Sequence, residues 1–188
     1  AIGSTKNHPM GFGAYDGWLL KVDRRGRRAW DVIFGGGNDD QFTDIQQTMD
    51  GGYIIAGYAT PGANAAARGW LMKVDQNSQL RWSMLYGAGS ALTAVQQTTD
   101  GGYIACGHAR AMGGTNDELD FWLLKTDGNG NLQWQKTLGT PGNDLASSLQ
   151  QTPDGGYVVY GQADSSNGTL LIKIDANGDE EWRQSYSY

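Results

Sequence analysis

The chain has little of what cross-links a protein, breaks its strands or anchors it in a membrane. It has one cysteine, Cys106, which excludes an internal disulfide, and four prolines in 188 residues. No apolar run approaches the roughly 18 residues that a membrane-spanning helix needs, so we expect no membrane span. Basic residues are outnumbered by acidic ones, 14 to 20. A nucleic-acid partner is therefore not expected, because phosphate binding favours an excess of Lys and Arg.

Two further scarcities limit the chemistry that the chain can perform. His8 and His108 are the only histidines, and neither belongs to a Cys/His spacing that indicates zinc. We therefore predict surface histidines, and a packing role for Cys106. The one basic cluster, at residues 24–28 around Gly26, is interpreted as a solvated hairpin tip, with a polyanion site as the alternative.

Glycine and tryptophan are abundant, and they recur in a long repeat. The chain has 29 glycines and seven tryptophans. A Trp-Leu-Leu-Lys-Val-Asp block recurs with small changes at Trp18–Asp23, Trp70–Asp75, Trp122–Asp127 and Leu170–Asp175. The closing aspartates are 52, 52 and 48 residues apart, and a second Trp follows seven residues after each of them. A period near 50 residues indicates a propeller, a solenoid or an array.

Each repeat reads as four short β-strands, A to D. Strand A is predicted at Phe42–Thr48, Leu92–Thr98 and Leu145–Thr152, and strand B at Tyr53–Ala59, Tyr103–Ala109 and Tyr157–Ala163. Strand C is the block described above, and strand D is predicted at Trp30–Phe34, Trp82–Tyr86, Trp134–Leu138 and Trp182–Tyr186. An Asp-Gly-Gly turn joins A to B, and Asp-Gly between apolar runs is a strong hairpin signal. The pattern predicts an all-β chain, a β-propeller of about four four-stranded blades. The tryptophans are then expected to pack between blades.

The consensus resembles a known repeat. Its best matches are Asp50–Gly57, Asp100–Gly107 and Asp154–Gly161, each followed by a strand C block. The combination is similar to the Asp-Gly-Gly-Tyr-Ile / Trp-Leu-Leu-Lys-x-Asp β-propeller repeat of secreted and cell-surface proteins of bacteria and archaea. The resemblance implies an extracellular or cell-surface location. It implies no particular chemistry, because a fold does not carry a site.

The first blade is predicted to be incomplete. Gly3 precedes Trp18 by the same 15 residues that separate Gly107 from Trp122, so residues 1–5 match the end of a strand B. The prediction is one domain, 1–188, with a partial blade at 1–34 and blades at 42–86, 92–138 and 145–186. The simplest arrangement is a ring that lacks one inner strand. The alternative is a part of a longer propeller.

An unpaired strand edge is a template for another chain. We therefore predict an assembly edge made of residues from both ends of the chain: Ala1, Ile2, Gly3, Ser4, Thr5, Tyr186, Ser187 and Tyr188. A neighbouring copy would fill the incomplete blade, and a separate peptide is the alternative occupant. Such a contact repeats into a filament if it does not close into a ring.

The remaining acidic residues suggest few sites. The repeated Asp23, Asp75, Asp127 and Asp175 are interpreted as turn residues that could also pair with Lys21, Lys73, Lys125 and Lys173 in a ladder between blades. Oxygen-rich loops make calcium a possible cofactor at Asn38–Asp40, at Asn143 and Asp144, and at Asn116, Asp117, Glu118 and Asp120. Asp44 alone breaks the pattern of strand A. It is weak support for a glycoside-processing enzyme, which uses two or three carboxylates.

The sequence therefore favours a non-enzymatic structural or adhesion module, outside the cell or at its surface, that self-assembles by strand complementation. No cofactor other than calcium is expected, and the expected partners are neighbouring copies. The alternative is a lectin-like propeller that binds glycans between its blades.

Overall fold

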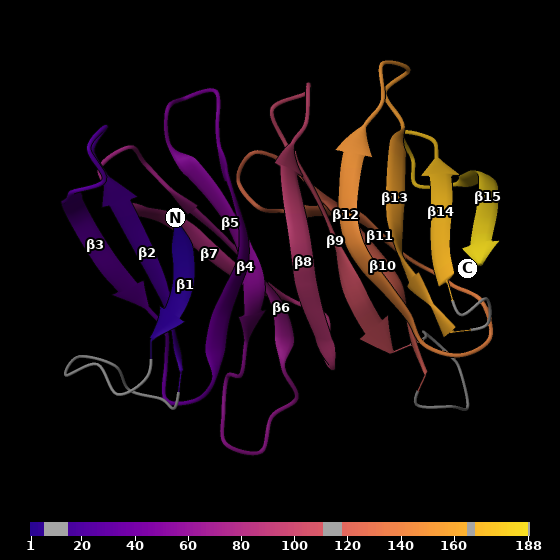
Figure 1. Ribbon diagram of the computed structural model, residues 1–188, viewed down its shortest axis with the longest axis horizontal. Helices are drawn as coiled ribbons and strands as arrows, with labels where there is room; N and C mark the ends of the chain where they lie inside the picture. The colour runs from indigo at the N-terminus through magenta and orange to yellow at the C-terminus, as the bar shows by residue number, and fades with distance from the viewer. Residues whose placement is uncertain (6–14, 111–117, 165–167, 188) are drawn as a thin grey trace.

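The computed structural model describes residues 1–5, 15–110, 118–164 and 168–187, and these residues form four antiparallel β-sheets (Figure 1). The first sheet has three strands, and each of the other three has four. This confirms the predicted fold: a four-bladed, propeller-like all-β chain with an incomplete first blade. Within the described residues, no helix is long and apolar enough to cross a membrane.

The strands follow the predicted order within each blade. The first blade holds β1 (Ile2–Thr5), β2 (Asp16–Val22) and β3 (Arg28–Phe34). The second holds β4 (Asp40–Gln47), β5 (Tyr53–Ala59), β6 (Arg68–Val74) and β7 (Leu80–Tyr86). The third holds β8 (Ser90–Gln97), β9 (Tyr103–Arg110), β10 (Leu119–Thr126) and β11 (Leu132–Leu138). The fourth holds β12 (Asp144–Gln151), β13 (Tyr157–Ala163), β14 (Gly168–Ile174) and β15 (Glu180–Ser187).

The four blades lie in a row in sequence order. Strands β1, β4, β8 and β12 run side by side at the front of Figure 1, and each packs against the next. The first and fourth blades lie at opposite ends of the longest axis, with the N-terminus near one and the C-terminus near the other (Figure 1). They do not meet as the first and last blades of a ring would, so each end of the row presents the face of a blade.

The core consists of three apolar clusters, one at each junction between successive blades. Along strand C, alternate residues point to opposite faces of the sheet, as the period of two requires. At the first junction Leu19 of β2 packs with Phe42 and Trp70 of the second blade. Leu71 and Leu123 repeat this contact at the second and third junctions. One blade therefore buries its apolar face only against its neighbour, as in other repeat proteins.

Turn chemistry explains why the blades have this shape. In the Asp-Gly-Gly turns, Gly51, Gly101 and Gly155 have φ of +78°, +83° and +87°, which glycine adopts without strain. In strand A, a β-bulge shifts the register between Phe42 and Asp44, and again at the equivalent places in β8 and β12. Glycine is also required opposite the bulge, because a Cβ on Gly57 would overlap the carbonyl oxygen of Gln41.

Candidate functional site: the blade junctions and the open faces

The inner half of the second and third junctions is held by the glutamines of the Gln-Gln-Thr motif. Gln97 N–H donates to Gln46 Oε1 at 2.7 Å, and Gln97 Oε1 accepts from Met49 N–H at 2.8 Å. The third junction repeats both bonds: Gln151 N–H donates to Gln96, and Thr99 N–H donates to Gln151. Each motif therefore joins the innermost strand of its blade to that of a neighbour.

Threonines at the bulges add a second link between inner strands. Thr43 Oγ1 donates to the carbonyl of Leu92 at 2.8 Å, and Thr93 Oγ1 donates to that of Ala146 at 2.7 Å. Asp44, the residue that breaks the repeat, accepts from Val95 N–H at 2.9 Å. Its carboxylate thus links β4 to β8.

The outer half of a junction is a Trp and a Tyr that hold the next blade's C–D turn. Trp82 Nε1 donates to Gly128 O at 3.2 Å, and Tyr86 OH donates to Gly130 O at 2.5 Å. Burial raises the pKa of the Tyr86 hydroxyl, so it remains a donor. At the third junction, Lys136 pairs with Asp179 of the corresponding turn at 2.8 Å. Trp134 also lies against this turn, because a Cβ on Gly178 would come within 3.0 Å of its ring. The second Trp of the motif therefore contacts the next blade's turn at both junctions.

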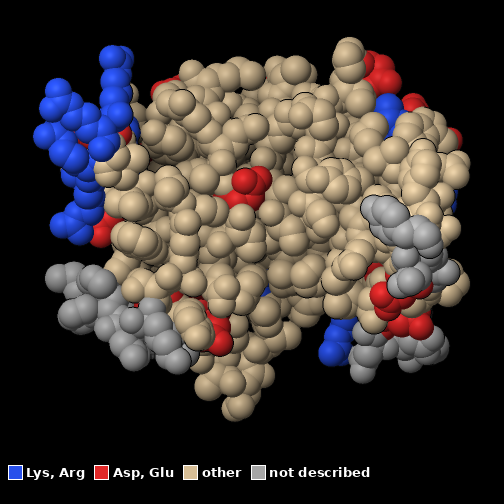
Figure 2. Space-filling model, in the orientation of Figure 1, with Lys and Arg blue, Asp and Glu red and all other residues tan. Residues whose placement is uncertain are grey.

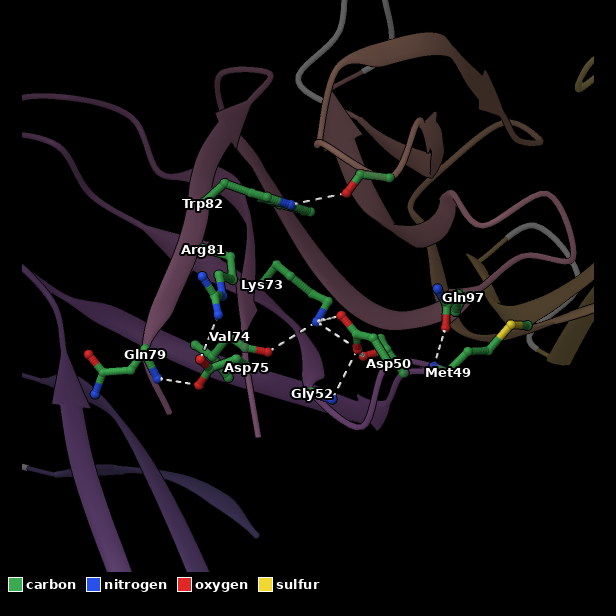
Figure 3. A network of polar contacts seen from close by, with 12 residues as sticks. Met49, Asp50, Gly52, Lys73, Val74, Asp75, Gln79, Arg81, Trp82 and Gln97 are labelled. Atoms are coloured by element: carbon green, nitrogen blue, oxygen red, sulfur yellow. Dashed lines mark hydrogen bonds and ion pairs between the residues drawn. The ribbon is translucent and has the colours of Figure 1, made fainter. Parts of the chain in front are cut away.

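The predicted pairing of each strand C lysine with the aspartate two residues later is wrong. Lys73 Nζ instead lies 2.9 Å from Asp50 of the Asp-Gly-Gly turn and donates to Val74 O (Figure 3). Lys125 pairs with Asp100 at 2.8 Å and Lys173 with Asp154 at 3.1 Å, all within one blade.

The aspartates that close strand C accept turn amides, as predicted. Asp75 Oδ1, for example, accepts from the N–H groups of Asn77 and Gln79 at 2.9 Å each. The lysine and the aspartate of one strand C block therefore have separate roles, and no ladder of ion pairs forms between blades at these positions.

A polar hollow opens beside these ion pairs at the second and third junctions. The second-junction hollow, of about 820 Å³, includes Lys73, Arg81 and Gln97, with Trp82 and Tyr103 as aromatic walls. Their ring centroids are 5.7 Å apart. The third junction has a smaller hollow of about 380 Å³ with Trp134 and Tyr157 in the same places. These are the shallow sites between blades that a lectin-like function would use.

The fourth blade presents the face that the second and third blades bury. Tyr160, Trp182 and Tyr186 are 48%, 45% and 56% exposed. The residues equivalent to Tyr160, which are Ala56 and Cys106, are fully buried by the following blade. We call this surface the open face of the fourth blade. Contiguous exposed apolar side chains mark interaction sites.

The first blade is exposed on its opposite face, the one that the other blades pack against the blade before them. Val22 is 45% exposed, although the equivalent Val74 is fully buried against the preceding blade. Among the described strands, β1 pairs with β2 alone and is an edge strand of its sheet. Ala1 joins this pairing: its N-terminal amine donates to Leu20 O at 2.9 Å, and its carbonyl accepts from Leu20 N–H. This β1 edge and Val22 form the open side of the first blade.

The predicted assembly edge is therefore divided between the two ends of the row. Residues 1–5 lie in and beside β1, and Tyr186 and Ser187 lie in β15, at the opposite end (Figure 1). Tyr188 lies outside the described residues. The two parts do not meet within one molecule, so only a second copy would bring them together.

The two ends also differ in charge. Figure 2 shows Lys and Arg gathered at the end that carries the β2–β3 turn, where Arg24, Arg25, Arg27 and Arg28 are exposed. At the opposite end, the β14–β15 turn and the start of β15 expose Asp179, Glu180 and Glu181. Salt bridges within each end neutralise part of this charge, such as Arg27–Asp23 at 2.7 Å.

Two of the remaining candidate residues, Cys106 and His108, lie in strand β9 of the third blade. Cys106 is fully buried, and burial raises the pKa of its thiol to about 12. His108, predicted to be a surface residue, is half-buried in β9, which pairs with β8 and β10. Burial lowers its pKa, and its Nδ1 has no hydrogen-bond partner among the described residues. His8 lies outside the described residues.

The loops proposed for calcium bring carboxylates near one another, but not in the arrangement of a metal site within the part of the chain that is described. Among the described residues, no set of three or more His, Cys, Asp or Glu side chains is placed to hold a metal ion. Burial raises the pKa of Asp40, and nearby Asp16 and Asp39 raise it further. Burial raises the pKa of Asp120, and nearby Asp144 and Glu118 raise it further. Asn116 and Asp117 lie outside the described residues.

Comparisons with known proteins bear on the fold of the chain and not on its function. No family model matches the chain, and no curated protein matches it. A mannose phosphorylase from Leishmania mexicana, MPT-4, is 14% identical with a TM-score of 0.50, over 89% of this chain and 66% of that one. A Bacteroides caccae protein of unknown function is 12% identical with a TM-score of 0.43, over 91% and 75%. The chain thus spans two thirds to three quarters of the length of these structures.

Proposed function

We propose that the chain is a non-enzymatic structural or adhesion module, outside the cell or at its surface, whose copies associate head to tail. The open face of the fourth blade of one copy packs on the open side of the first blade of the next. Strand complementation at the β1 edge is the second part of this contact. Because the two surfaces differ, the contact is heterologous, and repetition gives filaments unless a ring closes.

The observation that carries the proposal is the exposure of Tyr160, Trp182 and Tyr186 on the open face. The chain buries the equivalent face three times, each time against the following blade. The first blade of a second copy offers the surface that these contacts use, with Val22 in the place of Val74. Aromatic side chains of this size contribute most to binding when they are covered at the centre of an interface.

Charge supports the same orientation. At the second junction, the C–D turn of the following blade lies against Trp82 and Tyr86 of the preceding blade. For two copies in this arrangement, the turn would be the basic one at residues 24–28. It would approach Glu180 and Glu181, which begin the strand that carries Trp182. Opposite charges at an interface increase the rate of association and disfavour other orientations.

Pro153 is consistent with this partner. In the second and third blades, the residue that follows Gln-Gln-Thr donates its N–H to a glutamine in strand A of the next blade. In the fourth blade this residue is Pro153, which has no N–H to donate. The first blade as described has no strand A and thus no such glutamine. Pro153 therefore donates no such bond across this contact, whichever strand fills the β1 edge.

The test is the dependence of the molar mass on protein concentration, measured by sedimentation. The native chain should form species larger than a monomer, and Tyr160→Glu should prevent them, because a charge cannot be buried there without a partner. Met49→Glu is the matched control, since Met49 is exposed and lies outside both surfaces. A peptide with the sequence of residues 40–47 should compete for the β1 edge. A native chain that stays monomeric at every concentration would contradict the proposal.

Glycan binding remains the second candidate function, because of the hollows at the second and third junctions. They combine an aromatic pair with polar side chains such as Lys73 and Gln97. A glycan array is the direct test, with Gln97→Ala expected to weaken binding. No binding to any glycan would remove this candidate without affecting the first.

A further inference from the structure

A third hollow lies at the first junction and differs in chemistry from the other two. We call it the first-junction cavity. It has a volume of about 330 Å³, and its apolar walls include Phe34, Trp70 and Leu80. Its polar lining consists of the Gly35–Gly37 peptide, Asp40, Thr60 and Ser83. The Asp40 oxygens accept the N–H groups of Gly36 and Thr60, which leaves further lone pairs for a ligand. One acid in a largely apolar hollow indicates a ligand with a positive group on an apolar stem.

The equivalent places at the other junctions contain an arginine side chain of the protein itself. At the third junction, Arg183 Nη1 donates to the carbonyl of Gly139 at 2.6 Å. Arg183 also lies close enough to Asp120 and Asp144 for both to raise its pKa, after its hydrogen bond with Glu180. At the second junction, Arg68 Nε donates to the carbonyl of Gly87, also at 2.6 Å.

The strand registers identify the corresponding residues at the first junction. Ser83 pairs with Met72 as Arg183 pairs with Ile172, so Ser83 occupies the place of Arg183. Asp16 begins β2 two residues before Trp18, as Arg68 begins β6 two residues before Trp70. Gly35 follows its strand D as Gly87 and Gly139 do. The first junction therefore has the glycine and the carboxylates but neither arginine.

Asp16 is a second buried carboxylate close to the cavity. The residue is 1% exposed, and its Oδ2 has no hydrogen-bond partner among the described residues. A Cβ on Gly35 would overlap Asp16 Oδ1, so this carboxylate lies behind Gly35, one of the residues that line the cavity. Burying a carboxylate oxygen without a hydrogen-bond donor is costly, and a cation bound nearby would reduce that cost.

We propose that the first-junction cavity binds a guanidinium group of a ligand, in the place that Arg183 occupies at the third junction. The group would donate to Asp40 and to the carbonyl of Gly35, and its stem would lie between Phe34 and Trp70. Guanidinium is preferred to ammonium because it is planar, stacks on aromatic rings and donates several hydrogen bonds at once. The source is either an arginine side chain of a peptide or a free guanidino compound.

Calorimetric titration with arginine amide and with the peptide Gly-Arg-Gly tests this proposal, each beside its citrulline counterpart, which keeps the shape without the charge. Arginine should bind at least about tenfold more tightly than citrulline, because a charge-assisted hydrogen bond is lost. Asp40→Asn should reduce the affinity by a similar factor. Ser83→Arg should abolish binding and raise the melting temperature, because it supplies the guanidinium from within. Ser185→Arg, which adds the same charge on an exposed position of β15, should leave binding unchanged.

Binding of the peptide but not of the amide would identify a protein source, and the reverse would identify a small molecule. Equal affinity for citrulline, full affinity in Asp40→Asn, or no saturable binding of either probe would overturn the inference. The measurement is made at concentrations where the chain is monomeric, so its outcome does not depend on head-to-tail association.

Discussion

Replacing Asp100 by Asn removes the one carboxylate that pairs with the buried Lys125 among the residues that the structure describes. The Lys125 ammonium is nearly inaccessible, with 4% of its side chain exposed. It donates to Asp100 at 2.8 Å, to Gln133 at 3.0 Å and to Thr126 O at 3.1 Å. All three of its donors are thus satisfied, and the substitution keeps the geometry while it leaves the buried charge unpaired.

The size of the effect follows from the exposure of the two partners. Breaking a fully buried ion pair costs about 3–5 kcal/mol, and exposed pairs are worth about 0–1 kcal/mol. Asp100 is 57% exposed, so water screens part of the interaction, and we expect a loss of about 1–2 kcal/mol. Lys125→Met should cost less, about 0–1 kcal/mol, because it removes the buried charge and leaves Asp100 in water.

Urea unfolding, followed by tryptophan fluorescence at pH 7, measures both variants. Asp100→Asn should be the less stable of the two. The pH dependence gives a second test. Burial opposes ionisation of Asp100, but hydrogen bonds from Lys125, Thr98 and Gly102 outweigh it and lower its pKa to about 2. This stabilisation is therefore present above the unfolded pKa of 3.8 and is lost as the pH falls towards 2. Asp100→Asn should abolish that part of the acid dependence. Equal stability of the two variants, or an unchanged acid dependence, would refute the reasoning.

Three further predictions concern the junctions and the core. Gly107→Ala should destabilise the fold by about 3 kcal/mol in the same urea assay, because its Cβ would overlap the Ala91 carbonyl oxygen at the bulge of β8. Tyr86→Phe should cost about 1 kcal/mol through loss of the buried bond to Gly130 O, and an unchanged midpoint would contradict this role. Cys106 should resist alkylation at pH 8 until the chain unfolds, because its thiol is buried and its pKa is about 12. Rapid labelling of the native chain, detected by mass spectrometry, would count against it.

Most of the fold could be predicted, because the local signals repeat. The Asp-Gly-Gly turns fix where strand A ends and strand B begins, and strand B of the second blade has the predicted bounds, Tyr53–Ala59. Strand A begins earlier than predicted, at Asp40 instead of Phe42. The β-bulge explains this difference, since it lets residues before it continue to pair, and nothing in the residue types reveals it.

Side-chain partners were harder to predict, because they depend on the register between strands. Lys73 and Asp75 are two residues apart on one strand, which suggested a pair. In the structure, Lys73 lies opposite Ile54, next to the turn that carries Asp50. The first-junction cavity was missed for the same reason. It depends on Ser83 occupying the place of Arg183, and only the aligned strands of two blades reveal that substitution.

A mixing experiment with two variants tests head-to-tail association most directly. Tyr186→Glu places a charge on the open face of the fourth blade, and Val22→Glu places one on the open side of the first blade. Both side chains are exposed in a single copy, so each variant should fold. Each alone should sediment as a monomer, because every contact between copies would include the altered surface. An equimolar mixture should give a dimer and nothing larger, since only one intact pair of surfaces remains. A mixture that stays monomeric while the native chain associates, or either variant associating alone as the native chain does, would contradict the account.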